Sequence, residues 1–215
     1  MQSWMKRDRL RRSGPFLGGL CFITDRKVSG LSAEEMVAAA LEAGAAWVQY
    51  REKEKSRREV YIEALKLREL TSEFNAALIV NDYADVALAV GAEGVHLGQD
   101  DLPLREARAL MGEKIVGIST HSVSEAVEAE EGGADYIGFG PLFPTATKDA
   151  GKPKGLEMLR EVRKHVKIPI VAIGGISLPV LLEVFESGAD AVAVASAILR
   201  GDISENVRSF MKAIG

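Results

Sequence analysis

The pentapeptide Gly-Ala-x-x-Val/Ile occurs four times in this chain, beginning at positions 44, 91, 133 and 188. Each copy joins the end of a helical pattern to the start of a short apolar run, where glycine suits the turn that ends many helices. Successive copies are 47, 42 and 55 residues apart, which leaves room for two strand–helix units each. Such a repeat predicts alternating strands and helices, and therefore a parallel sheet covered by helices.

Eight short apolar segments alternate with helical patterns along the chain. Ser-x-x-Glu sequences beginning at Ser32, Ser56 and Ser122 predict capping boxes at the starts of three helices. The pattern predicts a single (β/α)8 TIM barrel over residues 16–215. The alternative is a doubly wound open sheet, which the lack of Gly-x-Gly-x-x-Gly after the first strand disfavours. Strands are expected at residues 20–24, 47–49, 78–80, 94–97, 115–119, 136–139, 169–173 and 191–195.

The composition is that of a soluble globular protein, with 47% hydrophobic and 27% charged residues. No apolar run approaches the ~18 residues that span a bilayer. The single cysteine, Cys21, excludes an internal disulfide and fits a reducing, cytoplasmic compartment. A net charge of −4 argues against a nucleic-acid surface. Residues 1–15 differ: five cations between Lys6 and Arg12, against one acid, predict a basic N-terminal extension outside the barrel.

The second predicted strand runs into a charged segment, QYREK, that begins at Gln49. In a barrel of this type the ligand site lies at the carboxyl ends of the strands. Alternation along a strand directs Gln49, Arg51 and Lys53 to one side, where two cations and an amide would bind an anion. The alternative is a solvated run of charge that extends to Arg58.

Carboxylates follow the third and fourth predicted strands, at Asn81-Asp82 and at Asp101. Neighbouring parallel strands lie about 5 Å apart, so the two aspartates could share one cation. Mg²⁺ is the natural candidate, because it accepts one or two carboxylates and completes its shell with phosphate oxygens and water. The alternative is that each aspartate caps the next helix, before Tyr83 or before Pro103.

The stretch from Tyr136 onward begins as an apolar strand and breaks at Gly140-Pro141. It then presents two hydroxyls and an ammonium group, at Thr145, Thr147 and Lys148. These groups suit a phosphorylated ligand, and an ordinary polar surface loop is the alternative.

A second anion site is indicated at the ends of the last two strands. Gly174-Gly175 follows the seventh strand, and Ala195-Ser196 leads from the eighth strand into a helix start. Glycine amides beside a helix N-terminus match the usual phosphate site of such barrels. Ser119-Thr120-His121 follows the fifth strand, so the predicted rim offers one site for a diphosphate and another for a monophosphate.

The three histidines provide no obvious general base. His96, within a strand, is expected to be a packed, hydrogen-bonded core residue, and His121 lies near the rim. His165 lies at a helix end, where the helix dipole favours it. The pattern fits a reaction whose difficulty is the departure of diphosphate, in which cations and a metal stabilise the leaving group.

Six segments of the chain are together highly specific: QYREK at 49, NDYADVALAVGAEGVHLGQDDLP at 81, GIST at 117, GADYIGFGPLFPTATK at 133, IPIVAIGGI at 168 and AVAVASAI at 191. Through these segments the chain resembles the thiamine-phosphate synthase (thiamine-phosphate pyrophosphorylase) family from about residue 20 to residue 200. The resemblance implies a transferase that joins a pyrimidine methyl diphosphate to a (carboxy)thiazole phosphate and releases diphosphate. It also implies a dissociative course: diphosphate leaves, a pyrimidine-stabilised carbocation forms, and the thiazole nitrogen captures it.

The same resemblance implies a role for each candidate residue. Mg²⁺ would be held by Asp82 and Asp101. The catalytic residues would be Arg51, Lys53, Ser119 and Lys148. The pyrimidine diphosphate would be bound by Gln49, Arg51, Lys53, Asn81, Ser119 and Lys148, and the thiazole phosphate by Thr145, Thr147, Gly175, Ala195 and Ser196. Two positions depart from the family pattern: Tyr50 replaces an aliphatic residue and should point away from the site, and Ala195 replaces a larger one.

Two other functions stay open. A thiazole tautomerase would need the monophosphate site and an acid–base pair that could include His121, but no diphosphate site. A non-catalytic barrel that binds a phosphorylated ligand would leave the two carboxylates unexplained. The predicted partners are small-molecule substrates, without nucleic acid or membrane, and a homodimer is left open.

Overall fold

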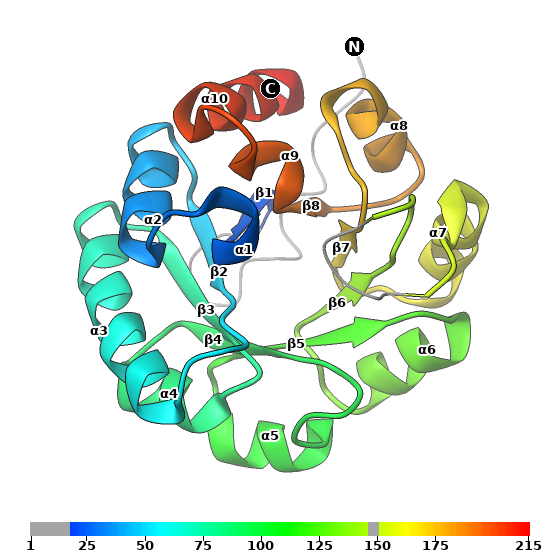
Figure 1. The fold of residues 1–215 in the computed structure, drawn as a ribbon. Coiled ribbons are helices and arrows are strands. Elements are labelled where there is room, and N and C mark those ends of the chain that lie inside the picture. Colours follow the sequence, from blue (N-terminus) through cyan, green and yellow to red (C-terminus); the bar gives the residue numbers. More distant parts are fainter. Residues whose placement is uncertain (1–17, 146–150) are drawn as a thin grey trace.

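Residues 18–145 and 151–215 are described by a computed structural model, in which eight strands close into a parallel barrel (Figure 1). Each strand pairs with the next along the chain, and the last pairs with the first. The predicted (β/α)8 barrel is therefore confirmed, with every strand boundary within one residue of its predicted position. The strands are β1 (Gly19–Ile23), β2 (Trp47–Tyr50), β3 (Ala77–Asn81), β4 (Gly94–Leu97), β5 (Ile115–Thr120), β6 (Tyr136–Phe139), β7 (Ile170–Ile173) and β8 (Ala191–Val194).

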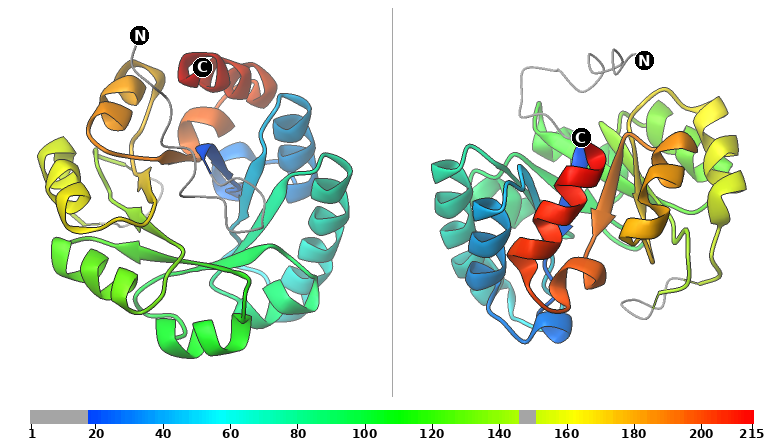
Figure 2. Two further views of the ribbon diagram at one scale, coloured as in Figure 1. Left: turned by 180° about the vertical axis from the view of Figure 1, so that it is seen from behind. Right: turned by 90° about the horizontal axis from the view of Figure 1, so that it is seen from above.

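Helices surround the strands, whichever end of the barrel faces the viewer (Figures 1 and 2). None of the helices in the described part of the chain is long and apolar enough to cross a membrane. The predicted basic extension, residues 1–15, lies outside the described residues and stays a prediction. The helices are α1 (Arg26–Ser29), α2 (Ala33–Glu42), α3 (Arg57–Glu73), α4 (Ala84–Ala89), α5 (Leu104–Met111), α6 (Val123–Glu131), α7 (Gly155–His165), α8 (Leu181–Glu186), which a 3-10 turn at Leu178–Val180 precedes, α9 (Ser196–Leu199) and α10 (Ile203–Ile214).

The capping boxes predicted at Ser32 and Ser56 are complete, since each serine and the glutamate three residues later bond to one another's backbone N–H. At Ser122 only half of the box forms. The Ser122 hydroxyl accepts the N–H of Glu125, but the Glu125 carboxylate accepts the N–H of His121 at 2.8 Å. The sequence therefore marks the starts of α2, α3 and α6 correctly, but not every bond at them.

Two layers of side chains leave the strands, one toward the helices and one into the lumen of the barrel. The lumen holds two large rings, Trp47 and Tyr136, edge to face with their centroids 5.5 Å apart. Glycine makes room for these rings. A Cβ atom on Gly117 would lie 2.1 Å from the Tyr136 ring, and one on Gly138 would lie 2.9 Å from His96. Small residues on β5 and β6 are thus a condition for filling the barrel.

The third residue of the repeated motif joins neighbouring units at the base of the barrel, where the strands begin. In three copies this residue is an acid that accepts an N–H near the start of the preceding strand, at 2.8 to 2.9 Å. The same acid pairs with an arginine on the helix before that strand. The first copy has Ala46 at this position and lacks the pair. The pairs are Glu93 with Arg68, Asp135 with Arg108, and Asp190 with Arg163.

Replacing Asp135 by alanine should lower the free energy of unfolding by about 2 kcal/mol, because the Val116 N–H and the Arg108 guanidinium lose a shared acceptor. Urea unfolding followed by circular dichroism measures the loss. Glu157→Ala is the control: this side chain is 89% exposed, and losing its pair with Arg160 should cost less than about 0.5 kcal/mol. If Asp135→Ala lost no more stability than Glu157→Ala, the ion pair of Asp135 at the base of the barrel would be dispensable.

Candidate active site

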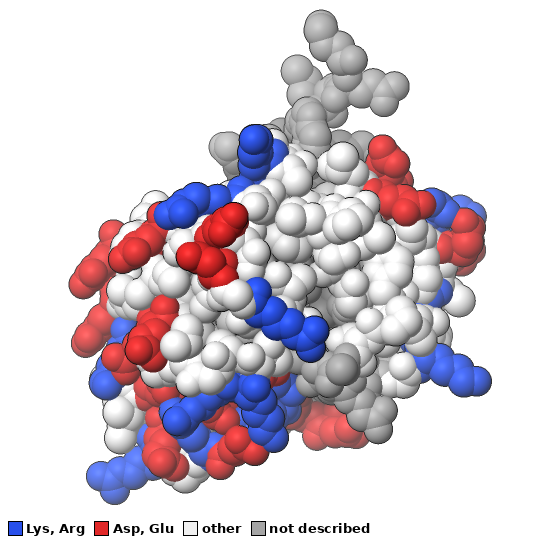
Figure 3. Space-filling model, turned by 45° about the horizontal axis from the view of Figure 1, so that its top comes forward, with Lys and Arg blue, Asp and Glu red and all other residues white. Residues whose placement is uncertain are grey.

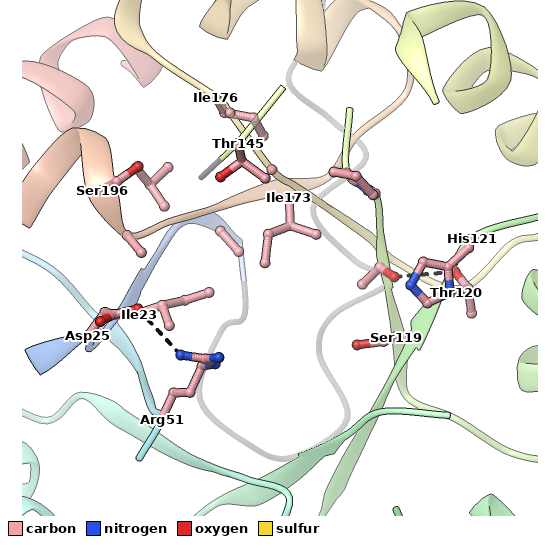
Figure 4. A pocket seen from close by; sticks show the side chains of 18 residues that line it. Ile23, Asp25, Arg51, Ser119, Thr120, His121, Thr145, Ile173, Ile176 and Ser196 are labelled. Carbon is pink, nitrogen blue, oxygen red and sulfur yellow. Dashed lines mark hydrogen bonds and ion pairs between the residues drawn. The ribbon is translucent and has the colours of Figure 1, made fainter. Parts of the chain in front are cut away.

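A pocket lies at the carboxyl ends of the strands and brings together six of the predicted site residues (Figure 4). They come from five different strand ends, so only closure of the barrel could unite them. Two further predicted residues, Thr147 and Lys148, lie outside the described residues. The six residues are Arg51 after β2, Ser119 on β5, Thr145 after β6, Gly175 after β7, and Ala195 and Ser196 after β8.

Tight packing between two loops shapes one side of this pocket. Gly174 and Gly175 have φ of 94° and 67°, a conformation that favours glycine. A Cβ atom on Gly175 would lie 2.6 Å from the carbonyl oxygen of Pro144, and the Phe143 N–H donates to Gly174 O at 3.0 Å. The β7 turn therefore lies directly against the loop that bears Thr145, and backbone groups from both loops can approach one ligand.

Arg51 meets a carboxylate at the pocket that was not among the predicted residues. Its Nη1 atom lies 3.4 Å from Asp25 Oδ2, a contact drawn in Figure 4. Asp25 also caps α1, because its side chain accepts the N–H groups of Lys27 and Val28. The four residues of α1 are too few to show helical periodicity. The available signal was an aspartate, a preferred N-cap, shortly after the end of the first strand.

Lys53, Asp82 and Asp101 form a second cluster, beside the ends of β3 and β4. Asp82 Oδ2 accepts a hydrogen bond from Lys53 Nζ at 2.5 Å, and Asp82 Oδ1 accepts one from Asn81 Nδ2 at 2.6 Å. Burial raises the pKa of the Asp82 carboxyl; the Lys53 ammonium opposes this rise and the adjoining Asp101 carboxyl adds to it. Two acidic groups are thus held together where one of them is already partly desolvated.

Neither aspartate caps a helix, so the capping alternative is wrong for both. The N-cap positions are Tyr83 for α4 and Pro103 for α5, and no side-chain bond closes either helix start. Asp82 instead has a left-handed backbone with φ of 68°, which few non-glycine residues adopt. Asp101 Oδ2 accepts the N–H of Gly98 at 2.7 Å. Strain and proximity of like charges at one place are typical of a functional site.

The donor set of this cluster fits a magnesium ion. Carboxylate oxygens are the ligands that Mg²⁺ prefers, and a divalent cation would offset the repulsion between Asp82 and Asp101. Among the described residues, no group of three or more His, Cys, Asp or Glu side chains could hold a metal. The protein would therefore supply two carboxylates and leave the remaining positions to water and substrate, the usual arrangement for Mg²⁺.

Buried amides connect the carboxylate cluster with the lumen. Gln49 and Asn81 are 6% and 8% exposed, and Gln49 Nε2 donates to Asn81 Oδ1 at 2.8 Å. Asn81 in turn donates to Asp82. This chain of hydrogen bonds fixes the orientation of the Asp82 carboxylate, as the outer partners of metal ligands commonly do.

His96 lies in the lumen beside Ser119. Its two ring nitrogens are each 2.9 Å from a hydroxyl, Nδ1 from that of Tyr136 and Nε2 from that of Ser119. As expected, His96 is a hydrogen-bonded core residue, only 8% exposed. It orients the Ser119 hydroxyl, which belongs to the pocket lining.

His121 also lines the pocket. Its Nδ1 atom lies 3.0 Å from Glu125 Oε2, the carboxylate that holds its backbone N–H. His165 is remote from this pocket, at the end of α7, with Nδ1 at 2.9 Å from the carbonyl oxygen of Glu161. Of the two, His121 is the one whose position permits contact with a ligand.

The face drawn in Figure 3 is mainly uncharged across its middle, apart from a basic side chain beside a hollow, and most of its charged side chains lie toward the edge. Acidic and basic side chains are interleaved there, so the described residues form no broad area of one sign on this face. Apart from this face, charged groups meet at the rim of the barrel in two clusters, Arg51 with Asp25 and Lys53 with Asp82.

Comparison with known proteins identifies close relatives over most of the chain. The model of a family described as thiamine monophosphate synthase matches residues 20–198. Thiamine-phosphate synthase from Chloroflexus aurantiacus is 52% identical over 185 residues, which are 85% of this chain and 86% of the relative. The enzyme of that name from Methanospirillum hungatei is 47% identical over 196 residues, 89% and 95% of the two chains.

Solved structures agree with this assignment. Thiamine phosphate pyrophosphorylase from Pyrococcus furiosus is 41% identical, has a TM-score of 0.86, and the match covers 97% of this chain and 96% of that one. A thiamine phosphate pyrophosphorylase from Bacteroides thetaiotaomicron, 19% identical with a TM-score of 0.63, shows likeness of fold only. The resemblance inferred from the sequence motifs is confirmed. The chain belongs to the thiamine monophosphate synthase family.

Proposed function

We propose that the chain joins 4-amino-2-methyl-5-(diphosphooxymethyl)pyrimidine to a (carboxy)thiazole phosphate, giving thiamine phosphate and diphosphate. Relatives named thiamine-phosphate synthase, at 47% and 52% identity, make it a transferase. Within the structure, the observation that carries the proposal is the contact of Asp82 with Asp101 and Lys53 at the rim of the barrel. A paired carboxylate site beside a lysine suits a reaction that expels diphosphate.

Arg51, Lys53 and Lys148 would supply positive charge to the diphosphate. A guanidinium can hold two phosphate oxygens at once, and an ammonium adds a compact point charge. Lys53 bonds to Asp82, so binding of substrate would transfer this lysine to a phosphate oxygen. Mg²⁺ held by Asp82 and Asp101 would neutralise further charge on the leaving group and favour its departure.

Gln49, Asn81 and Ser119 would bind the pyrimidine. Their side chains are held from behind, the amides by one another and the hydroxyl by His96. In a dissociative course the pyrimidine becomes positively charged once diphosphate has left. Fixed neutral dipoles can stabilise that charge, and the thiazole nitrogen can then capture the cation without help from a general base.

The thiazole phosphate would occupy the side of the pocket formed by the β6, β7 and β8 loops. Hydroxyls and backbone N–H groups hold a phosphate monoanion or dianion well, and the packing of Gly175 on Pro144 supports such close approach. The proposed ligands are Thr145, Thr147, Gly175, Ala195 and Ser196, of which Thr147 lies outside the described residues.

The proposal also covers the compartment in which the chain acts and the partners it binds. A cytoplasmic location is supported by Cys21, a lone buried thiol. The partners would be small-molecule substrates, without nucleic acid or membrane, and a homodimer stays an open alternative.

A thiazole tautomerase remains the second candidate function, because His121 and Glu125 form an acid–base pair on the pocket wall. Such an enzyme would have no use for the Lys53, Asp82 and Asp101 cluster. The synthase uses both clusters and is therefore preferred.

The purified chain, mixed with the pyrimidine diphosphate, the thiazole phosphate and Mg²⁺, should release diphosphate and thiamine phosphate in equal amounts. Excess EDTA should abolish both products, because the leaving group then lacks its metal. Chromatography of the products and a coupled diphosphate assay measure the two yields. Absence of product with all components present would refute the proposed function.

Asp82→Asn should lower kcat/KM by about 100-fold or more, since asparagine tolerates the left-handed backbone but removes the charge that binds the metal. Unfolding by urea should be close to that of the wild type. The matched control is Asp100→Asn, an exposed residue that should keep nearly full activity. If Asp82→Asn were as active as this control, Asp82 would not be a metal ligand.

Lys148→Ala should reduce turnover far more than Lys152→Ala, because the proposal assigns only Lys148 to the diphosphate. Lys152 is exposed and four residues further along the same segment. Steady-state rates at saturating substrates make the comparison. Equal rates in the two variants would mean that this loop is ordinary surface.

A further inference from the structure

One carboxylate on α3 holds both ends of the loop that carries Arg51 and Lys53. Glu63 accepts a hydrogen bond from the Tyr50 hydroxyl at 2.5 Å through Oε2. Through Oε1 it accepts one from Lys55 Nζ at 2.6 Å. Tyr50 is the last residue of β2, and Lys55 lies two residues before the start of α3. The two oxygens of Glu63 therefore close a ring around the four residues between them.

This contact is largely withdrawn from solvent. Tyr50 is 1% exposed, and the side chains of Glu63 and Lys55 are 12% and 23% exposed. A carboxylate removed from water is stable only when its oxygens are satisfied, and both oxygens of Glu63 are. Burial, and then the bond to Glu63, raise the pKa of the Tyr50 hydroxyl, which accordingly remains a hydrogen-bond donor at neutral pH.

The enclosed loop presents two long cationic side chains toward the site. Arg51 reaches Asp25, and Lys53 reaches Asp82 although its side chain is 46% exposed. Long side chains of this kind lose rotamer entropy when they bind a ligand, and a mobile backbone beneath them would add to that cost. Fixing both ends of the loop removes the backbone contribution before the ligand arrives.

Lys55 also shows which cations of this segment are available to a ligand. Alternation along the chain would group Lys55 with Arg51 and Lys53, but its ammonium is committed to Glu63 on the helical side of the barrel. Tyr50 is packed on that side too, among the buried side chains that lie between the strands and the helices. The segment thus has two cations that face the site, Arg51 and Lys53. Behind them lie the contacts of Tyr50 and Lys55 with Glu63, which we call the Glu63 anchor.

We propose that Glu63 is a positioning residue for the diphosphate half of the reaction, acting through Tyr50 and Lys55 on the loop that bears Arg51 and Lys53. It touches neither substrate nor metal. The inference rests on the proposed function, because the two cations matter only if a diphosphate binds between them. Its effect should therefore fall on one substrate and spare the other.

The test compares Glu63→Gln, Tyr50→Phe and Lys55→Met with Lys66→Met. Lys66 lies on the same helix and pairs with Glu34 at the surface, where the two side chains are 56% and 45% exposed, so it controls for loss of an ion pair on α3. Glu63→Gln should raise the KM for the pyrimidine diphosphate about tenfold and leave the KM for the thiazole phosphate within about twofold. Lys66→Met should change neither value.

The two single-contact variants should each give part of this effect, and combining either with Glu63→Gln should add little, because both act through the same carboxylate. A loss of folded protein would lower the apparent kcat and leave both KM values alone. The proposal would be overturned if Glu63→Gln changed neither the KM for the pyrimidine diphosphate nor that for the thiazole phosphate, or changed both equally. If that variant does not fold, Tyr50→Phe, which keeps the packed ring, decides by the same criterion.

Amide hydrogen exchange gives a readout that does not depend on turnover. Residues 51–55 should exchange faster in Glu63→Gln than in the wild type, and calorimetry with inorganic diphosphate and Mg²⁺ should show weaker binding. If the wild type makes no thiamine phosphate, the proposed function fails, but amide exchange and diphosphate binding still test whether Glu63 positions the loop. Unchanged exchange together with unchanged diphosphate binding in Glu63→Gln would show that it does not.

Discussion

The pairing of an arginine with the acid of the repeated motif determines how neighbouring units of this barrel meet. The acid stands directly before one strand and accepts an N–H of the strand before it, so it ties two strands together where they begin. The arginine adds the helix, and Arg108 and Arg163 also bond to backbone carbonyls that follow their own helices. Backbone groups at the base are thereby satisfied within the protein.

The opposite end of the strands follows a different rule. There Asp82 keeps a left-handed backbone and lies against Asp101, an arrangement that costs stability. Such a cost is tolerated where a ligand or a metal is to supply the missing interactions. Because the base is fixed by its own ion pairs, the rim can hold like charges together without loss of the fold.

The fold could be predicted because periodicity, capping sequences and the repeat all point to the same architecture. The sidedness of Gln49, Arg51 and Lys53 could be predicted from alternation alone. The side chains that these residues and their neighbours contact could not be predicted in this way. Asp82 could cap a helix or belong to a charged cluster. Its role depends on Asp101 and Lys53, which lie near Asp82 only in the folded chain. Asp25 was missed for the same reason, since its contact with Arg51 joins residues 26 apart in sequence.

The lumen connects the two ends. Gly117 and Gly138 leave space for Tyr136 and His96, whose rings stack with their centroids 5.5 Å apart. Because Tyr136 engages Nδ1 of His96, the other ring nitrogen is directed to Ser119 at the pocket. A packing requirement in the middle of the barrel, met by two glycines, therefore decides where a hydroxyl at the rim is held. The lumen thus limits conformational freedom at Ser119 from within the barrel, as Glu63 limits it from outside for the loop of Arg51 and Lys53.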